Sequence, residues 1–337
     1  FQNWEALAVS FPGYTSGMIC RFLNASTADG YNPYRITRNG IDWEVVDAHD
    51  PWSYIGYWGD HQIRYLLKLL EHLERHDPVE LRGFLTRDIF AYANVPYRIK
   101  PYAALLANPK DTVVFDPHLE KLVHQRVQAK GADGKLVWDK NGHVRLVNLT
   151  EKLLVPLLAK LSNFIPGAGI WLNTQRPEWN DANNALVGNG CSMVTLYYIR
   201  RYLTFCQDLF HDNADKNFAL SAEVAGFLDA LNQTLRRQRR LLDGTIADNS
   251  RRRIVDDLGN AGSEYRQRIY TTSFSQNKTP INGQQLLDFF ASALAWTNHS
   301  IHANRRPDGL YHSYNLIRLE DRKALPIRRL YEMLEGQ

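Results

Sequence analysis

Cysteines are few in this chain, and long apolar runs are missing. The 337 residues include three cysteines, Cys20, Cys191 and Cys206, which are too few and too scattered for a disulfide framework or a structural zinc site. The longest apolar runs, such as 153–158, are far shorter than the roughly 20 residues of a bilayer-spanning helix, and no charged leader precedes an apolar segment. We therefore expect a cytoplasmic protein in a reducing compartment, with no membrane contact.

Signatures of several catalytic classes are missing as well. The chain has no Gly-X-Ser-X-Gly nucleophile elbow, and its Gly-Ala-Gly at 167–169 stops short of a nucleotide-binding fingerprint. Cys191 and Cys206 stand at apolar helical positions, where a buried, inert thiol is the usual state. Nucleophilic serine or cysteine catalysis is therefore not expected, and no cofactor is predicted.

The positive charge is concentrated in two short runs. The formal net charge is +4 and the isoelectric point is about 8.8, and much of the excess lies in 236–240 and 251–253. Both runs fall in helix-forming sequence, where arginines usually form a solvated or ion-paired face. We therefore predict no nucleic-acid partner.

Apolar residues at helical spacing recur along the chain, as in Ile63, Leu66, Leu67 and Leu70. Helices are predicted over 4–10, 17–23, 63–73, 117–129, 153–161, 194–205, 220–242, 254–270, 284–302 and 327–334. Strand-like sequence is confined to 112–115 and to a hairpin of 135–138 with 144–147, which turns at Asn141-Gly142. The fold class is therefore mainly α.

Long connections rich in Gly, Asn, Asp, Pro and aromatic residues join these helices. They span 24–59, 91–116, 163–181 and 271–283. Loops of this length in a compact helical domain are more often functional than idle. Strand-like pieces and charged helices interrupt the pattern at 77–149, so we interpret the chain as one domain, 1–337, with a small α+β insertion at about 77–149.

The segment 176–188 contains two carboxylates, an indole and three side-chain amides. Cleavage of a glycoside needs a carboxylic acid that protonates the departing oxygen, aromatic faces that hold a pyranose ring and polar groups that bind its hydroxyls. Asp181 is the candidate acid. The candidate substrate-binding residues beside it are Gln175, Arg176, Glu178 and Trp179. In a competing interpretation, Asp181 only caps a helix that runs through Ala185.

A second cluster of acids, histidines and tryptophans lies between Asp42 and Gln62. Its candidate substrate-binding residues are His49, Asp50, Trp52, Trp58 and Asp60. The tryptophans offer stacking faces for a sugar, and Asp60 is also placed to cap the helix predicted from 63. His49, Asp50, Asp60 and His61 are conceivable metal ligands, but they form no helical His-X-X-X-His pair and no cysteine joins them, so no metal is predicted.

In their order along the chain, these segments resemble the catalytic domain of the inverting glycoside phosphorylases of the cellobiose and chitobiose phosphorylase type, within the six-hairpin glycosidase superfamily. Trp179-Asn180-Asp181 and the residues up to Leu196 are similar to the family's Trp-Asn-Asp-Gly segment and the helix after it. Gly59-Asp60-His61-Gln62-Ile63 resembles the Asp-His pair that opens a core helix. The resemblance covers about 1–75 and 150–205.

The resemblance implies an (α/α)6 toroid, which this chain need not contain completely, with the site in the loops at one end. It also implies inversion at the anomeric carbon, with Asp181 as the general acid and inorganic phosphate as a co-substrate. The implied partners are an oligosaccharide substrate and a second copy of the chain in a homodimer. Because neither Phe1 nor Glu335-Gly336-Gln337 looks like a natural end, we also expect other domains of a longer polypeptide.

The sequence departs from the family pattern at several positions. Pro177-Glu178 replaces the usual Gly-Asp, Ala182 replaces a Gly, and the phosphate-binding Thr-His segment has only a faint counterpart in Tyr311-His312-Ser313. An inverting hydrolase, which needs a second carboxylate about 6.5–9.5 Å from the acid, and a sugar-binding scaffold without turnover therefore stay open. Candidates for an anion site are Gln175, Arg176 and His312, and candidates for a base are Asp47, Asp50 and Glu264.

Overall fold

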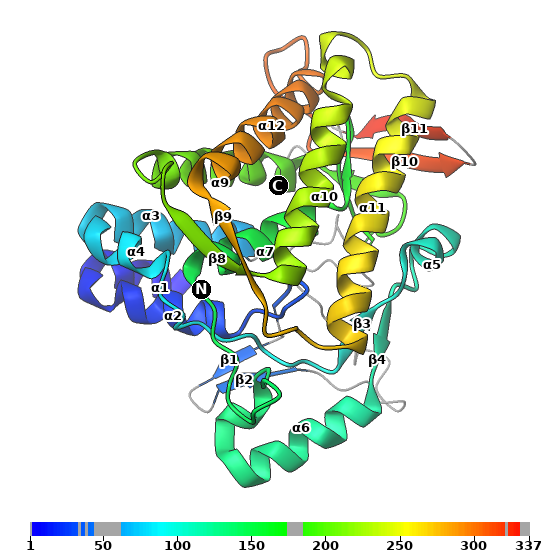
Figure 1. Ribbon diagram of the computed structural model, residues 1–337. Coiled ribbons are helices and arrows are strands. Elements are labelled where there is room, and N and C mark those ends of the chain that lie inside the picture. The colour runs from blue at the N-terminus through cyan, green and yellow to red at the C-terminus, as the bar shows by residue number, and fades with distance from the viewer. Residues whose placement is uncertain are drawn as a thin grey trace.

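The computed structural model describes residues 2–32, 35–37, 40–43, 62–173, 185–320 and 323–330. Most of these residues are helical, which confirms the mainly α fold class. In Figure 1 the long helices surround a central one, α7 (Leu149–Leu161), and a small sheet lies at one side. No described helix is long and apolar enough to cross a bilayer.

The helices fall close to the positions that apolar spacing predicts. The others are α1 (Gln2–Ser10), α2 (Thr15–Asn24), α3 (Leu67–His76), α4 (Pro78–Phe84), α5 (Tyr102–Ala107), α6 (Pro117–Lys130), α9 (Met193–His211), α10 (Ala222–Arg237), α11 (Asp248–Thr271) and α12 (Gly283–His302). Short helical turns are η1 (Pro12–Tyr14), η2 (Gln62–Leu66), η3 (Gly131–Lys135) and η4 (Arg239–Asp243). The helix predicted over 220–242 begins later than expected, because its first residues belong to a strand.

The central helix α7 is buried along its whole length. All 13 of its residues are buried, including Glu151 and Lys152. Gly30, in the loop after α2, lies so close to it that an added Cβ would be 2.6 Å from Cβ of Ala159. Gly30 also has a φ of +90°, a conformation that glycine adopts without strain. This glycine therefore lets the loop after α2 pack directly on the central helix.

A five-stranded antiparallel sheet covers one end of the helical core. Its strand order is β11-β10-β7-β6-β5. The strands are β5 (Phe164–Ile165), β6 (Gly169–Trp171), β7 (Gly190–Ser192), β10 (Tyr314–Glu320) and β11 (Lys323–Leu330). β5, β6 and β7 have only two or three residues, too few to show an alternating pattern. The longer β10 and β11 come far later in the chain, so the sequence did not predict that they pair with β7 to form one sheet.

The helix predicted over 327–334 is wrong where the structure describes it. Residues up to Leu330 belong to β11, which pairs with β10 at the edge of the sheet. The register shifts between Leu316 and Ile317, opposite Pro326. Proline lacks an N–H and is tolerated in a sheet at edge strands and bulges, and Pro326 stands at such a place.

Smaller paired segments complete the described fold. They are β1 (Arg35–Thr37) with β2 (Gly40–Asp42), β3 (Tyr97–Ile99) with β4 (Val113–Phe115), and β8 (Asn217–Ser221) with β9 (Lys278–Asn282). The predicted strand at 112–115 is thus confirmed. The predicted turn at Asn141-Gly142 is confirmed too, with Gly142 at φ +80°, but only isolated bridges form beside it, such as Trp138 with Val144.

Residues 77–149 contain helices as well as strands and are joined to the rest of the chain. Figure 1 places α6 at the bottom, below β1 and β2. The indole of Trp43 donates to Glu120 of α6 at 2.8 Å. The hydroxyl of Tyr102 in α5 donates to Asp256 of α11 at 2.7 Å, and this hydrogen bond and burial both raise the pKa of the phenol.

Candidate active site

The ten site residues predicted from the sequence lie in 44–61 and 174–184, outside the residues that the structure describes. They are His49, Asp50, Trp52, Trp58, Asp60, Gln175, Arg176, Glu178, Trp179 and Asp181. Asp47 lies there too. Their placement in a site stays a prediction, and what the structure provides is the geometry of the residues that flank them.

The described flanks of these two segments lie against each other. Residues 44–61 lead directly into η2, a π-helical turn, a form that is frequent at functional sites. In η2, the guanidinium of Arg64 stacks 4.5 Å from the ring centre of Tyr198 in α9, and its Nη2 lies 3.4 Å from the phenol oxygen. Farther along the same helices, Arg201 forms hydrogen bonds of 2.6 and 2.8 Å with Glu71. The chain after the first segment is therefore fixed to the helix that follows the second.

The base of the second segment is closed by hydrogen bonds. The backbone N–H of Gly188 donates to the carbonyl of Leu172 at 2.6 Å, and the buried indole of Trp171 donates to the carbonyl of Gly188 at 2.9 Å. The amide of Asn173 donates to Oδ1 of Asn163 at 2.7 Å. The residues just before 174–184 are thus hydrogen-bonded to a residue just after it.

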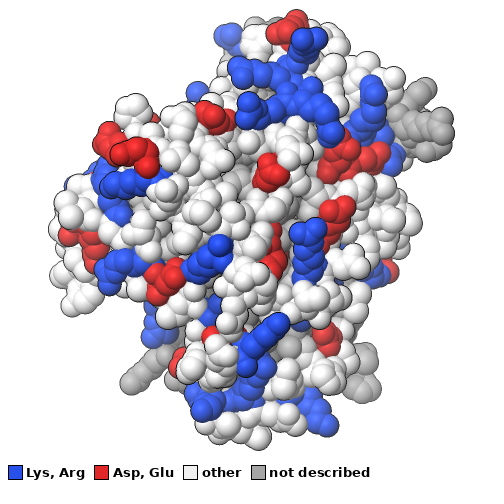
Figure 2. Space-filling view, in the orientation of Figure 1, with Lys and Arg blue, Asp and Glu red and all other residues white. Residues whose placement is uncertain are grey.

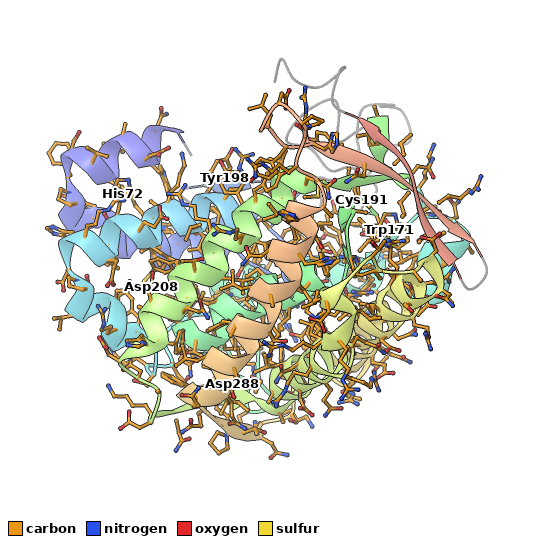
Figure 3. All side chains as sticks on the ribbon, turned by 90° about the horizontal axis from the view of Figure 1, so that it is seen from above. His72, Trp171, Cys191, Tyr198, Asp208 and Asp288 are labelled. Carbon is orange, nitrogen blue, oxygen red and sulfur yellow. The ribbon has the colours of Figure 1, made fainter. Side chains whose placement is uncertain are left out.

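These flanking residues share one end of the helical core. In Figure 3, Tyr198 and Cys191 lie in the upper half of the molecule, with Trp171 below Cys191, whereas Asp208 lies lower, near mid-height, and Asp288 lies toward the lower edge. Tyr198 and Asp208 both belong to α9. The N-terminal part of α9 therefore points to the same end as the sheet.

Side chains from α12 and β10 fix the turn between β5 and β6. Gly167 donates its N–H to Oγ of Ser300 at 2.9 Å and accepts from the amide of Asn304 at 2.9 Å. The amide of Asn315 donates to Ala168 at 2.8 Å and to Oδ1 of Asn304 at 2.9 Å. All three side chains are buried. Hydrogen bonds between buried groups hold one geometry, because an alternative would leave polar atoms unsatisfied.

The same turn is held from α11 by Arg251, whose Nε donates to the carbonyl of Pro166 at 2.9 Å. Arg251 is buried and pairs with Asp248, so of the predicted solvated or ion-paired face this residue is ion-paired and not solvated. The prediction is confirmed for the exposed Arg237, which pairs with Asp257 at 3.0 Å. Figure 2 shows Lys and Arg gathered at the top, over the connection between α10 and α11.

His312 lies next to the beginning of α9. It is buried, its carbonyl accepts from the hydroxyl of Tyr197 at 2.7 Å, and its N–H donates to Asn304. Burial raises the pKa of the Tyr197 phenol. Ser192 caps α9 by accepting from the N–H of Thr195 at 3.0 Å. The late histidine is thus brought to the helix that follows the Trp-Asn-Asp segment, about 130 residues earlier in the chain.

Other candidates have simpler roles. Glu264 is exposed on α11. Asp308 pairs with Arg306 at 2.6 Å and accepts from the N–H of Leu310 at 3.1 Å, so it is an ion-paired turn residue. Cys191 and Cys206 are buried, as predicted, and burial raises the pKa of both thiols. The predicted helical position is confirmed for Cys206 in α9 but wrong for Cys191, which lies in β7.

Two buried charged residues on α7, Glu151 and Lys152, were missed. Glu151 accepts from the hydroxyl of Tyr92 (3.0 Å) and from the N–H and hydroxyl of Ser221 (2.6 and 2.8 Å). Lys152 donates to the carbonyl of Ala91 at 2.8 Å, and its Nζ lies 3.8 Å from the ring centre of Tyr92. Burial lowers the pKa of Lys152. Adjacent charged residues at the start of a largely apolar helix were the signal, since charged side chains are almost never buried without polar partners.

No protein-family model matches the chain, and no curated protein is similar to it in sequence.

Proposed function

We propose that this protein cleaves a glycosidic bond with inversion, as a glycoside phosphorylase that uses Asp181 as its general acid. The acid protonates the departing oxygen, while phosphate attacks the anomeric carbon from the opposite face and gives a sugar 1-phosphate. Trp179 and at least one of Trp52 and Trp58 bind the sugar rings, and Asp60 binds hydroxyls of the cleaved sugar.

One observation carries the proposal: the flanks of the two motif-bearing segments are in contact through Arg64 and Tyr198. The segments are separated by more than a hundred residues in the sequence. A site needs its binding and catalytic groups within one cleft. Contact between the flanks supports the proposal that residues near Asp60 and Asp181 border the same site.

The described helices are consistent with an (α/α)6 toroid, which we propose as the architecture of the catalytic domain. Long helices pack in neighbouring pairs, α9 with α12 and α10 with α11. The central α7 lies inside them, in contact with both α10 and α11. Such an arrangement gathers successive loops at one end, where η2, β6 and β7 already lie close to α9.

We prefer phosphorolysis to hydrolysis as the proposed reaction because of the positions of two residues. His312, the candidate for the anion site, lies beside the start of α9. Glu264, the described candidate for a second carboxylate, is exposed on α11. A phosphorylase needs one enzyme carboxylate and an anion site, whereas a hydrolase needs two carboxylates.

The test is an assay of the whole protein on glucosyl and N-acetylglucosaminyl disaccharides, with and without phosphate. We expect a sugar 1-phosphate that forms only when phosphate is present. Asp181→Asn should lower its formation by about 10²–10⁴-fold, while Asp208→Asn, at the far end of α9 and exposed, should leave it unchanged. Phosphate-independent release of free sugar would replace phosphorolysis by hydrolysis, and near-normal activity of Asp181→Asn would remove Asp181 as the acid.

A further inference from the structure

A second pocket lies between α6 and the C-terminal end of α11, apart from the residues that flank the candidate active site. Its volume is about 210 Å³. Its walls come from the loop after α2, the start of β3, α6, the bridge at Val137–Trp138 and the end of α11. Since drug-sized ligands occupy pockets of about 300–1,000 Å³, this one fits a smaller molecule.

Two guanidinium groups line this pocket, Arg98 and Arg126. Arg126 is half-buried on α6 and, among the described residues, has no acid within ion-pairing distance. Arg98 stacks 4.5 Å from the ring centre of Tyr270 and lies 3.8 Å from Asp116, at the outer limit of an ion pair. Asp116 also caps α6 by accepting from the N–H of Leu119 at 2.9 Å. The two cations are therefore only weakly neutralised.

The pocket's own acid, Asp29, offsets only one of these two charges, and its oxygens already accept hydrogen bonds. Asp29 is buried and accepts from the hydroxyl of Thr27 at 2.5 Å and from the hydroxyl of Tyr270. Burial and the neighbouring Asp29 raise the pKa of Tyr270, so its hydroxyl keeps its proton. The charge available to a ligand in the pocket is positive.

Aromatic and polar side chains complete the lining. Phe274 is held between Tyr92, stacked at 5.7 Å, and the guanidinium of Arg145 at 4.6 Å. The indole N–H of Trp138 donates to the carbonyl of Asp133 at 2.9 Å, which fixes the ring in the wall. Asn94 lines the pocket as well and offers both a donor and an acceptor. Fixed aromatic rings suit the C–H faces of a sugar, and the amide suits its hydroxyls.

Ser273, also in the lining, has a φ of +58°. It is the single non-glycine residue with positive φ in the part of the chain that the structure describes. Such strained backbone conformations tend to occur at ligand-binding sites. We propose that this pocket binds a small anionic sugar, a monosaccharide that carries a phosphate or a carboxylate, with Arg98 and Arg126 on its anionic group.

Calorimetric titration of the whole protein in its Asp181→Asn form tests the proposal without turnover at the candidate active site. The probes are glucose 6-phosphate, glucose 1-phosphate, glucuronate, inorganic phosphate and glucose. We expect one of the sugar phosphates or glucuronate to bind, and to bind at least about tenfold more tightly than both phosphate and glucose, because the anionic group and the ring each contribute. Tighter binding of a sugar phosphate or of glucuronate identifies the anion.

Arg126→Gln should weaken this binding by at least about tenfold, since it removes a charge-assisted hydrogen bond. Arg236→Gln, at an exposed position on α10, is the matched control and should bind normally. Circular dichroism and melting temperature check that both variants are folded. If Arg126→Gln binds the probe as tightly as the unchanged protein does, the probe binds elsewhere, for example at the candidate active site, and the proposal is overturned. Equal binding of glucose, or of phosphate alone, or no binding of any charged sugar at 10 mM (about 100-fold above a 0.1 mM Kd), would also overturn it.

Discussion

The buried charges on α7 and the half-buried charges of the second pocket differ in their partners. Glu151 accepts three hydrogen bonds, and Lys152 donates to backbone carbonyls beside it. Arg126 on α6 is a cation like Lys152, yet no described acid pairs with it. A charge whose partners are all internal stabilises the fold, whereas a charge without them is available to a ligand.

Removing Glu151 should have the largest effect on stability. Glu151→Ala leaves Lys152 buried without its neighbouring charge and leaves the N–H of Ser221 without its acceptor. Glu151 accepts from three buried donors, and each buried donor left without an acceptor costs about 1–3 kcal/mol. Urea denaturation would measure this loss, and Glu264→Ala, on the exposed face of α11, should stay within about 0.5 kcal/mol of the wild type. A loss below 1 kcal/mol would mean that these hydrogen bonds do not stabilise the core.

Gly30→Ala should come next, because it tests the packing of the loop beside the second pocket on α7. The new methyl group would lie 2.6 Å from Cβ of Ala159, at a φ of +90°. We expect a loss of about 2–3 kcal/mol in the free energy of unfolding. Gly13→Ala, where nothing lies within 4 Å of the added Cβ, is the control. Equal stability of the two variants would contradict the close contact with α7.

High pH should lower the free energy of unfolding, and Tyr92→Phe should make this dependence on pH weaker. Burial raises the pKa of Tyr92, Tyr202, Tyr265 and Tyr270. Above about pH 10 the unfolded chain loses these protons while the folded chain keeps them, so stability falls as pH rises. Each such tyrosine contributes about 1.4 kcal/mol per pH unit. Denaturation curves from pH 9 to 11 should give a shallower slope for Tyr92→Phe, and an unchanged slope would contradict this assignment.

Arg64→Met should have the smallest effect on stability. It removes the stacking on Tyr198 at 4.5 Å, which is worth about 0.5–2 kcal/mol. If the two flanks border one site, Arg64→Met should lower the rate of disaccharide cleavage by more than its small effect on the free energy of unfolding explains. Arg200→Met, on the exposed face of α9, is the control. Equal activity of both variants would mean that the contact between Arg64 and Tyr198 does not border the site.

The helices could be predicted from the sequence because their apolar spacing is a local property. α11, α12 and α6 all lie near their predicted ranges. Pairing between distant segments is not local, so β11 was mistaken for a helix, since Ile327 and Leu330 fit helical spacing as well as a strand. The sheet was missed for the same reason.

The candidate active site and the second pocket differ in how much of each could be predicted from the sequence. The ten predicted residues of the candidate active site occur in two compact motifs, which made a prediction possible, and they stay predictions. The second pocket combines Asp29, Arg98, Arg126, Trp138 and Tyr270. These residues are spread over 240 positions, and no single segment carries a pattern that would join them.

The closed base of residues 173–188 has a consequence for variation among proteins of this design. Hydrogen bonds from Gly188 to Leu172 and from Trp171 to Gly188 fix both ends of this stretch independently of what lies between them. The entropy of closing a loop grows only slowly with its length. Replacement or lengthening of the residues between the two ends should therefore leave the melting transition of the core nearly unchanged, so the sequence here can diverge without selection against misfolding.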